Sequence, residues 1–143
     1  MSPSPSSQSV DLKQAGLKTT LPRLRILAIL EAAGKRHFTA EDVYKTLLSA
    51  GEEIAFATVY RVLTQFENAG LVLRHNFEGG RSVFELDRGE HHDHMVCAKC
   101  GTVTEFFSAE IEELQRKMAD QHGFDLQDHS LYLYGVCADC QKA

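Results

Sequence analysis

The 143-residue sequence contains no tryptophan, only three prolines and no apolar run near the ~20 residues that a membrane-spanning helix needs. Its first residues, MSPSPSSQ, have neither the basic start nor the apolar stretch of a secretion signal. We therefore expect a cytoplasmic protein with no membrane partner, in which residues 1–9 form a disordered tail. Apolar residues make up 43% of the chain, which is enough to build a folded core.

Basic residues are also scarce, because 15 Lys and Arg stand against 20 Asp and Glu, for a net charge of −5. Proteins that bind nucleic acid usually carry a basic surface. The acidity is uneven, however: residues 1–88 hold 11 basic and 10 acidic side chains, whereas residues 89–143 hold 4 and 10. This asymmetry indicates two parts with two tasks, and bound cations would neutralise some of the charge of the acidic part.

Cysteine is absent from the first 96 residues, and the four cysteines form two C-x-x-C pairs, Cys97 with Cys100 and Cys137 with Cys140. Without a secretion signal the thiols should stay reduced, which argues against disulfide bonds. Two such pairs are the usual way to present four thiolates to Zn(II) in a tetrahedron. A redox role for one pair stays open, although the presence of two pairs favours a structural zinc site.

The first part of the chain has the pattern of short helices followed by a β-hairpin. We expect helices at residues 21–34, 39–51 and 57–69. Thr39 and Asp42 fit a capping box at the start of the second. We then expect strands at residues 71–75 and 82–86, joined by a turn at 77–80. This order predicts a winged helix-turn-helix, with the recognition helix at 58–66 and, on or beside the wing, Arg74, His75 and Arg81.

A recognition helix of this kind can enter the major groove of DNA. Its polar face carries Thr58, Tyr60 and Arg61. Tyr60 could touch thymine methyl groups, and Arg61 could bind a phosphate or a guanine edge. The alternative is a packed helical domain whose polar face is only solvated, and this segment alone does not decide between them.

After a polar connector at residues 87–90, the second part is predicted to contain strands and one helix. We expect strands at 91–96, 103–107 and 124–135, and a helix at 108–122. Ser108 can cap this helix, which has an apolar stripe of Ile111, Leu114 and Met118. A part this small needs help to bury its apolar side chains, so we expect zinc binding and homodimerisation.

The segment HHDH, residues 91–94, places four metal-competent side chains just before the first cysteine pair. In a strand, His91 and Asp93 point to one face and His92 and His94 to the other, so that one strand can serve two sites. Each pair needs further ligands, and the candidates are His37, Glu85, Glu105, Glu112 and His129.

Most histidines and glutamates that stand alone lie on the surface and bind nothing. We expect this of His75 and His122, and Glu112 by itself would be a solvated helix residue. The residues alone do not select His37 or Glu85 as ligands either, since both lie in the first part of the chain.

Five segments, taken in order, closely resemble the ferric uptake regulator family of bacterial repressors. They are GLKTTLPRLRIL, ATVYRVLTQFENAGLV, RHNFEGGRSVFEL, HHDHMVCAKCG and HSLYLYG, and the match runs from about Asp11 to Cys140. The resemblance implies an α+β fold, with an N-terminal winged helix-turn-helix DNA-binding domain at 10–86, a hinge at 87–90 and a small α/β metal-binding dimerisation domain at 91–143. It also implies a homodimer that binds A/T-rich inverted repeats in double-stranded DNA, with Lys18 near the minor groove.

The resemblance further implies three metal sites. A regulatory site between the domains would use His37, Glu85, His92 and His94, with Glu105 as a further candidate ligand. A second site, in the dimerisation domain, would use His91, Asp93, Glu112 and His129. Structural Zn(II) would be held by Cys97, Cys100, Cys137 and Cys140.

The regulatory ligands offer nitrogen and oxygen but no sulfur, which suits Fe(II), Mn(II) or Co(II) better than a zinc sensor. Glu85 and Glu105 also favour the iron-sensing branch, because aspartates tend to replace them in the peroxide-sensing branch. We therefore expect a repressor of iron-uptake genes that binds DNA when loaded with Fe(II), with Mn(II) as a surrogate. Zinc, manganese or peroxide sensing are the alternatives within the family.

Two other classes compete with a regulator, namely a zinc-dependent hydrolase and a zinc-ribbon adaptor that senses nothing. HHDH loosely resembles the ligand runs of dinuclear zinc enzymes. However, no general base is evident beside an open metal position, and the chain is short for a substrate cleft. We expect that the protein is not an enzyme.

Overall fold

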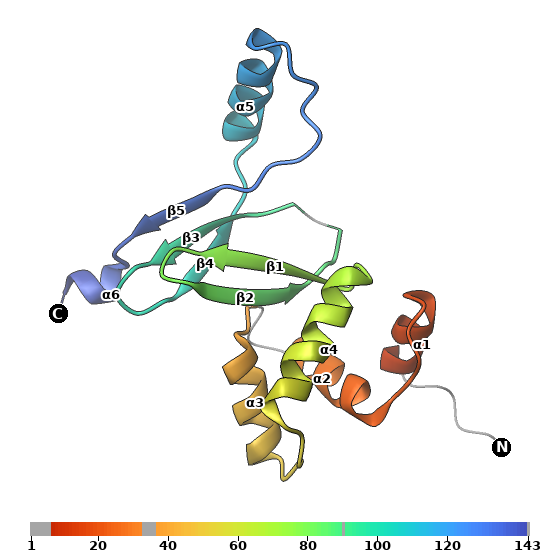
Figure 1. Ribbon diagram of the computed structural model, residues 1–143. Helices are drawn as coiled ribbons and strands as arrows, with labels where there is room; N and C mark the ends of the chain where they lie inside the picture. Colours follow the sequence, from red (N-terminus) through yellow and green to blue (C-terminus); the bar gives the residue numbers. More distant parts are fainter. Residues whose placement is uncertain (1–6, 33–36, 90, 143) are drawn as a thin grey trace. The chain divides into compact units, whose positions relative to one another are not determined.

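The computed structural model describes residues 7–32, 37–89 and 91–142, and the chain divides into two compact units, Met1–Arg88 and Gly89–Ala143 (Figure 1). The boundary falls inside the segment 87–90 that we expected to be a hinge, of which Glu90 lies outside the described residues. Helices and strands both contribute, which agrees with the expected α+β class. Among the described residues, no helix is long and apolar enough to cross a membrane.

The first unit begins with four helices: α1 (Ser7–Gln14), α2 (Leu21–Glu31), α3 (Ala40–Ser49) and α4 (Phe56–Asn68). Helix α1 was not predicted, and it begins inside the segment 1–9 that we expected to be disordered. That expectation is wrong for residues 7–9, while residues 1–6 lie outside the described part. The reason for the helix is Leu12, whose side chain is fully buried in the core. Helix α2 ends at Glu31, and residues 33–34 of the predicted helix are also outside the described part.

The capping box of α3 is confirmed, because Thr39 Oγ1 accepts the Asp42 N–H at 3.0 Å and Asp42 Oδ2 accepts the Thr39 N–H at 3.0 Å. Helix α4 buries one apolar stripe at helical spacing, formed by Val59, Val62, Leu63 and Phe66. This leaves its opposite face available for polar contacts. Leu48 of α3 is 52% exposed, because the packed stripe of this helix is centred on Val43 and Leu47.

The hairpin consists of β1 (Val72–Phe77) and β2 (Arg81–Leu86), paired antiparallel from Val72↔Leu86 to Phe77↔Arg81. Gly79 and Gly80 close it with φ values of 88° and 78°, which other residues rarely adopt. Successive strand residues point to opposite faces. One face, with Val72 and Phe84, packs on the helices. The other face carries two cross-strand pairs, in which Leu73 lies opposite Glu85 and His75 lies opposite Val83.

The second unit contains β3 (Asp93–Cys97), β4 (Val103–Phe106), α5 (Ala109–Gln121), β5 (Tyr132–Gly135) and α6 (Ala138–Gln141). The strand order is β4-β3-β5, with β3 antiparallel to β4 and parallel to β5. The strand predicted at 124–135 is therefore too long. Within the described residues β5 pairs with β3 alone, over four register positions from His94↔Tyr132 to Cys97↔Gly135, and residues 124–131 are not part of the sheet. The short helix α6 was not predicted.

The two units differ greatly in the size of their cores. Among the described residues, only Val96 and Cys97 of the second unit are buried apolar side chains, whereas the first unit has a continuous core. Helix α5 extends away from the sheet of its own unit (Figure 1), and none of its residues is buried. On this helix Leu114 is 59% and Met118 53% exposed. The second unit therefore needs stabilisation from another source.

Candidate DNA-binding face and metal-binding clusters

The exposed face of α4 carries the side chains that the sequence proposed for DNA contact. Tyr60 and Arg61 are exposed, Thr58 is half-buried, and Lys18, in the loop before α2, is exposed. Arg23 connects this loop to α4, since its guanidinium donates to the Lys18 carbonyl at 2.8 Å and to Gln65 Oε1 at 3.0 Å. Sequence reasoning did not find Arg23, and no local pattern marks it.

Arg74, expected on or beside the wing, joins the wing to α4. From β1 its guanidinium donates to Thr64 Oγ1 at 2.9 Å and to the Tyr60 hydroxyl at 3.3 Å. It also lies 3.3 Å from Glu67 Oε1, and its carbon is 4.8 Å from the centre of the Phe84 ring. Arg74 is thus a positioning residue for the exposed side chains of α4.

The four cysteines come together in the second unit, with their sulfur atoms within 4.8 Å of one another. Cys97 ends β3, Cys100 lies in the turn before β4, and Cys137 and Cys140 flank or belong to α6. Cys97 Sγ accepts the backbone N–H groups of Cys100 and Cys137, both at 3.4 Å. These four donors fit the tetrahedral sulfur set that Zn(II) prefers.

The ionisation of the cysteines also fits a cation. The two backbone N–H donors, from Cys100 and then Cys137, lower the pKa of the Cys97 thiol to about 5. The Thr102 hydroxyl, 3.0 Å from the Cys100 sulfur, is the main cause that lowers the pKa of Cys100. By contrast, hydrogen bonding to Cys137 and then Cys100 raises the pKa of the Cys140 thiol to about 12. A bound divalent cation would favour the thiolate form of Cys140 and so offset this rise in its pKa.

A second cluster in the same unit contains His91, Asp93, Glu112 and His129, with donor atoms within 4.8 Å of one another. His91 Nε2 lies 3.1 Å from Asp93 Oδ1 and 3.1 Å from Glu112 Oε1. His129 Nε2 is 3.1 Å from the same Glu112 oxygen and 3.6 Å from Asp93 Oδ1. Asp93 is fully buried, and within the described part of the chain its Oδ2 has no hydrogen-bond partner. A buried carboxylate with an unpaired oxygen is costly without a cation, so this cluster fits a metal ion.

Two other candidate ligands meet in the first unit. His37 Nε2 lies 3.2 Å from Glu85 Oε2. The neighbouring residues hold them side by side, because Phe38 and Phe84 exchange backbone hydrogen bonds of 2.9 and 2.7 Å. His75 also contacts this carboxylate, with its Nε2 2.5 Å from Glu85 Oε1, and only 9% of His75 is exposed. The expectation that His75 is a solvated surface residue is therefore wrong.

The remaining nitrogen and oxygen donors lie on the sheet of the second unit. His94 of β3 stands opposite Glu105 of β4, and His94 is buried. His92, just before β3, has its Nε2 3.8 Å from Glu105 Oε2. His92 and His94 therefore both lie beside Glu105, whereas His91 and Asp93 belong to the other cluster, as strand alternation predicted.

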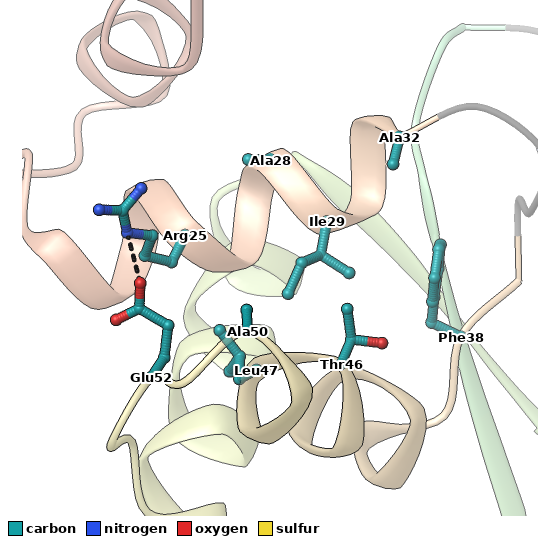
Figure 2. A pocket seen from close by; sticks show the side chains of 9 residues that line it. All are labelled: Arg25, Ala28, Ile29, Ala32, Phe38, Thr46, Leu47, Ala50 and Glu52. Atoms are coloured by element: carbon teal, nitrogen blue, oxygen red, sulfur yellow. Dashed lines mark ion pairs between the residues drawn. The ribbon is translucent and has the colours of Figure 1, made fainter.

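A cavity of about 390 Å³ lies between α2 and α3 (Figure 2). Ile29 and Leu47 contribute apolar walls, and an ion pair between Arg25 and Glu52, at 3.1 Å, lies at one end. The nine described residues that line it include no histidine or cysteine. The cavity gives no support to a metal-dependent hydrolase.

The comparison with known proteins decides between the remaining interpretations. The sequence profile of the ferric uptake regulator family matches residues 14–134. The chain belongs to this family. A ferric uptake regulation protein of Neisseria meningitidis serogroup C is 58% identical over 135 residues, which cover 94% of each chain.

Solved structures of ferric uptake regulators share the fold. The regulator of Vibrio cholerae has a TM-score of 0.85 at 55% identity, with 90% of this chain and 98% of that chain covered. The regulator of Pseudomonas aeruginosa, solved with manganese, has a TM-score of 0.77 at 54% identity, with 93% and 99% covered. The regulator of Francisella tularensis, solved with iron, has a TM-score of 0.84 at 40% identity, with 88% and 96% covered.

Membership in the ferric uptake regulator family establishes the class of function. The chain is a metal-dependent transcriptional regulator and not an enzyme. The resemblance predicted from the sequence segments is confirmed, and so is the α+β fold with its DNA-binding and dimerisation parts.

Proposed function

We propose that this ferric uptake regulator represses iron-uptake genes in the cytoplasm by binding A/T-rich inverted repeats as an Fe(II)-loaded homodimer. The observation that carries the proposal is the division of nitrogen and oxygen donors between the two units. His37 and Glu85 are adjacent in the first unit, and the second unit offers His92, His94 and Glu105. A metal ion bound by both sets ties the units together.

The donor set supports Fe(II) as the regulatory metal and Mn(II) as its surrogate. Histidine nitrogens and carboxylate oxygens without sulfur suit these ions, whereas zinc sensors more naturally recruit thiolate. All four cysteines are occupied in their own cluster. The manganese and iron found in two related regulators of known structure support the same choice.

The residues of the regulatory site act on DNA binding through the relative orientation of the units. A bound cation supplies an attraction that holds the donors of both units at once. Without it, the two recognition helices of a dimer rarely match the spacing of successive half-sites, which is about one turn of DNA. Most metal-free dimers are in conformations that cannot bind the operator. To make the DNA-binding conformation the major one, the metal must bind it about 5 kcal/mol more tightly than the other conformations, and four or five ligands can provide this difference.

Two further sites serve the second unit. The four cysteines hold structural Zn(II), and His91, Asp93, Glu112 and His129 hold a second divalent ion close to α5. Because Glu112 lies in the first turn of α5 and His129 precedes β5, this ion connects the helix to the sheet.

The exposed apolar side chains of the second unit support a homodimer. Six of them lie on α5, in the segment after it and on β5, namely Leu114, Met118, Phe124, Leu126, Leu133 and Tyr134, and Met95, Phe107 and Val136 are exposed as well. Phe124 is 70% exposed, which is unfavourable for a large apolar ring in a monomer. A second copy of the unit covers this surface.

Replacing Arg61 with alanine should weaken operator binding by about 1–3 kcal/mol, because the exposed guanidinium on α4 contacts a phosphate or a base edge. Fluorescence anisotropy of metal-loaded protein on an A/T-rich inverted-repeat duplex measures this change. Arg116→Ala removes the same charge from α5 in the second unit and should leave the affinity unchanged. Equal affinities for Arg61→Ala and the wild type would contradict the assignment of α4 as the recognition helix.

A further inference from the structure

The two oxygens of Glu85 have different neighbours within the first unit. Oε2 lies 3.2 Å from His37 Nε2, and these two atoms are the ligand pair that the proposed regulatory site takes from this unit. Oε1 lies 2.5 Å from His75 Nε2, and because an ionised carboxylate can only accept, the imidazole N–H is the donor in this hydrogen bond. The carboxylate therefore has one oxygen beside its co-ligand and one oxygen engaged by a histidine that the proposed site does not include.

His75 is held in place by the hairpin itself. In the β1–β2 register it pairs with Val83, two positions from the Leu73↔Glu85 pair, so His75 and Glu85 lie on the same face. Its ring stacks on Phe77 with 6.1 Å between ring centres and 6° between the planes. A ring fixed in this way can orient a neighbouring carboxylate with little loss of side-chain freedom on metal binding.

We propose that His75 is a positioning residue for the regulatory metal site, which orients Glu85 so that it offers the metal one oxygen. The inference rests on the proposed function, since it takes Glu85 as a ligand. By engaging Oε1, His75 keeps Oε2 toward His37 and prevents the carboxylate from binding through both oxygens. His75 is not itself a ligand, because the nitrogen nearest the site is committed to Glu85.

The expected loss of metal affinity when His75 is replaced can be taken from other metal sites in which a side chain hydrogen-bonds to a ligating carboxylate. Removing such an outer partner typically lowers metal affinity by about 10–100-fold. His75→Phe keeps an aromatic ring against Phe77 but removes the donor. His75→Gln restores an N–H donor of similar reach, so it should rescue positioning, whereas it would not rescue a lost metal ligand.

The test measures Mn(II) affinity in the full-length protein with its cysteine-bound zinc retained, by competition with a fluorescent chelator. His37→Ala identifies the regulatory ion as the one that this variant loses. For that ion we expect about 10–100-fold weaker binding in His75→Phe and near wild-type binding in His75→Gln. His122→Phe, which replaces an exposed histidine of the second unit, is the matched control and should leave the affinity unchanged.

The visible spectrum of bound Co(II) separates positioning from a merely structural role. With Oε1 released in His75→Phe, Glu85 can bind through both oxygens, which raises the coordination number and lowers the intensity of the d–d band. A structural role would change thermal stability without changing the band. If His75→Phe does not fold, His75→Asn replaces it, because the shorter amide cannot reach Oε1.

The possible results distinguish this inference from the proposed function. Wild-type affinity and an unchanged Co(II) band in His75→Phe would overturn the role of His75 while the regulatory site stands. A His75→Gln protein as weak as His75→Phe would also overturn it, because the hydrogen bond would not be the cause. If His37→Ala binds Mn(II) like the wild type, the regulatory site itself is wrong and the inference fails with it.

Discussion

Replacing Cys97 with serine should release zinc and unfold the second unit while the first unit stays folded. The reason is the small core of the second unit, in which Val96 and Cys97 are the only buried apolar side chains among the described residues. Structural Zn(II) sites contribute about 10–16 kcal/mol of apparent binding free energy at neutral pH. Whole domains are stable by only about 5–15 kcal/mol, so the unit cannot absorb this loss. The first unit has its own core and should not depend on zinc.

Hydrogen exchange with mass spectrometry measures this result unit by unit, together with the zinc content of the protein. Amides of β3, β4 and β5 should lose their protection in Cys97→Ser, and those of α2, α3 and α4 should keep it. Thr102→Val is the matched control, because it removes the hydroxyl beside the Cys100 sulfur but keeps all four thiols. Protected β3–β5 amides in a zinc-free Cys97→Ser protein would show that the cluster is not structural.

Replacing His92 and His94 together with alanine should abolish the response of DNA binding to the regulatory metal. In the wild type, metal binding is expected to change the equilibrium constant between the conformations that cannot and can bind DNA by about 10⁴-fold. Without the two nitrogens, the second unit offers only Glu105 to a metal held by His37 and Glu85. The operator affinity at saturating Mn(II) should therefore fall to that of metal-free protein.

The measurement is anisotropy on the operator duplex with and without Mn(II), and circular dichroism checks that the double variant is folded. His122→Ala removes an exposed histidine from the end of α5 and should retain the full metal response. A double variant that still responds to Mn(II) like the wild type would exclude His92 and His94 from the regulatory site. The response would then belong to another cluster.

Local patterns predicted the elements that depend on local sequence. The buried stripe of α4 follows from helical periodicity, and the capping box of Thr39 and Asp42 from spacing alone. The cysteine cluster was predictable because two C-x-x-C pairs contain nearly all the necessary information. Strand alternation likewise separated His91 and Asp93 from their neighbours.

Features that depend on contacts between distant residues were missed. Helix α1 has a single fully buried leucine, Leu12, and so shows no periodicity. The end of β3 limits the length of β5, which the sequence of residues 124–135 does not reveal. The burial of His75 depends on its place in the hairpin register, and the predicted strands, residues 71–75 and 82–86, imply a register that is shifted by one residue. In the observed hairpin Phe77 pairs with Arg81, one residue closer to the turn than the sequence predicted, and this register places His75 on the same face as Glu85.

The central claim is that Fe(II) or its surrogate Mn(II) switches on DNA binding, and anaerobic fluorescence anisotropy tests it most directly. Buffered Fe(II), Mn(II) and Zn(II) are titrated into protein that keeps only its cysteine-bound zinc, in the presence of an A/T-rich inverted-repeat duplex. We expect Fe(II) or Mn(II) to produce tight binding at micromolar free metal. Binding that only Zn(II) induces, at far lower free concentration, would identify a zinc sensor instead. Binding that no metal changes would contradict the proposed mechanism.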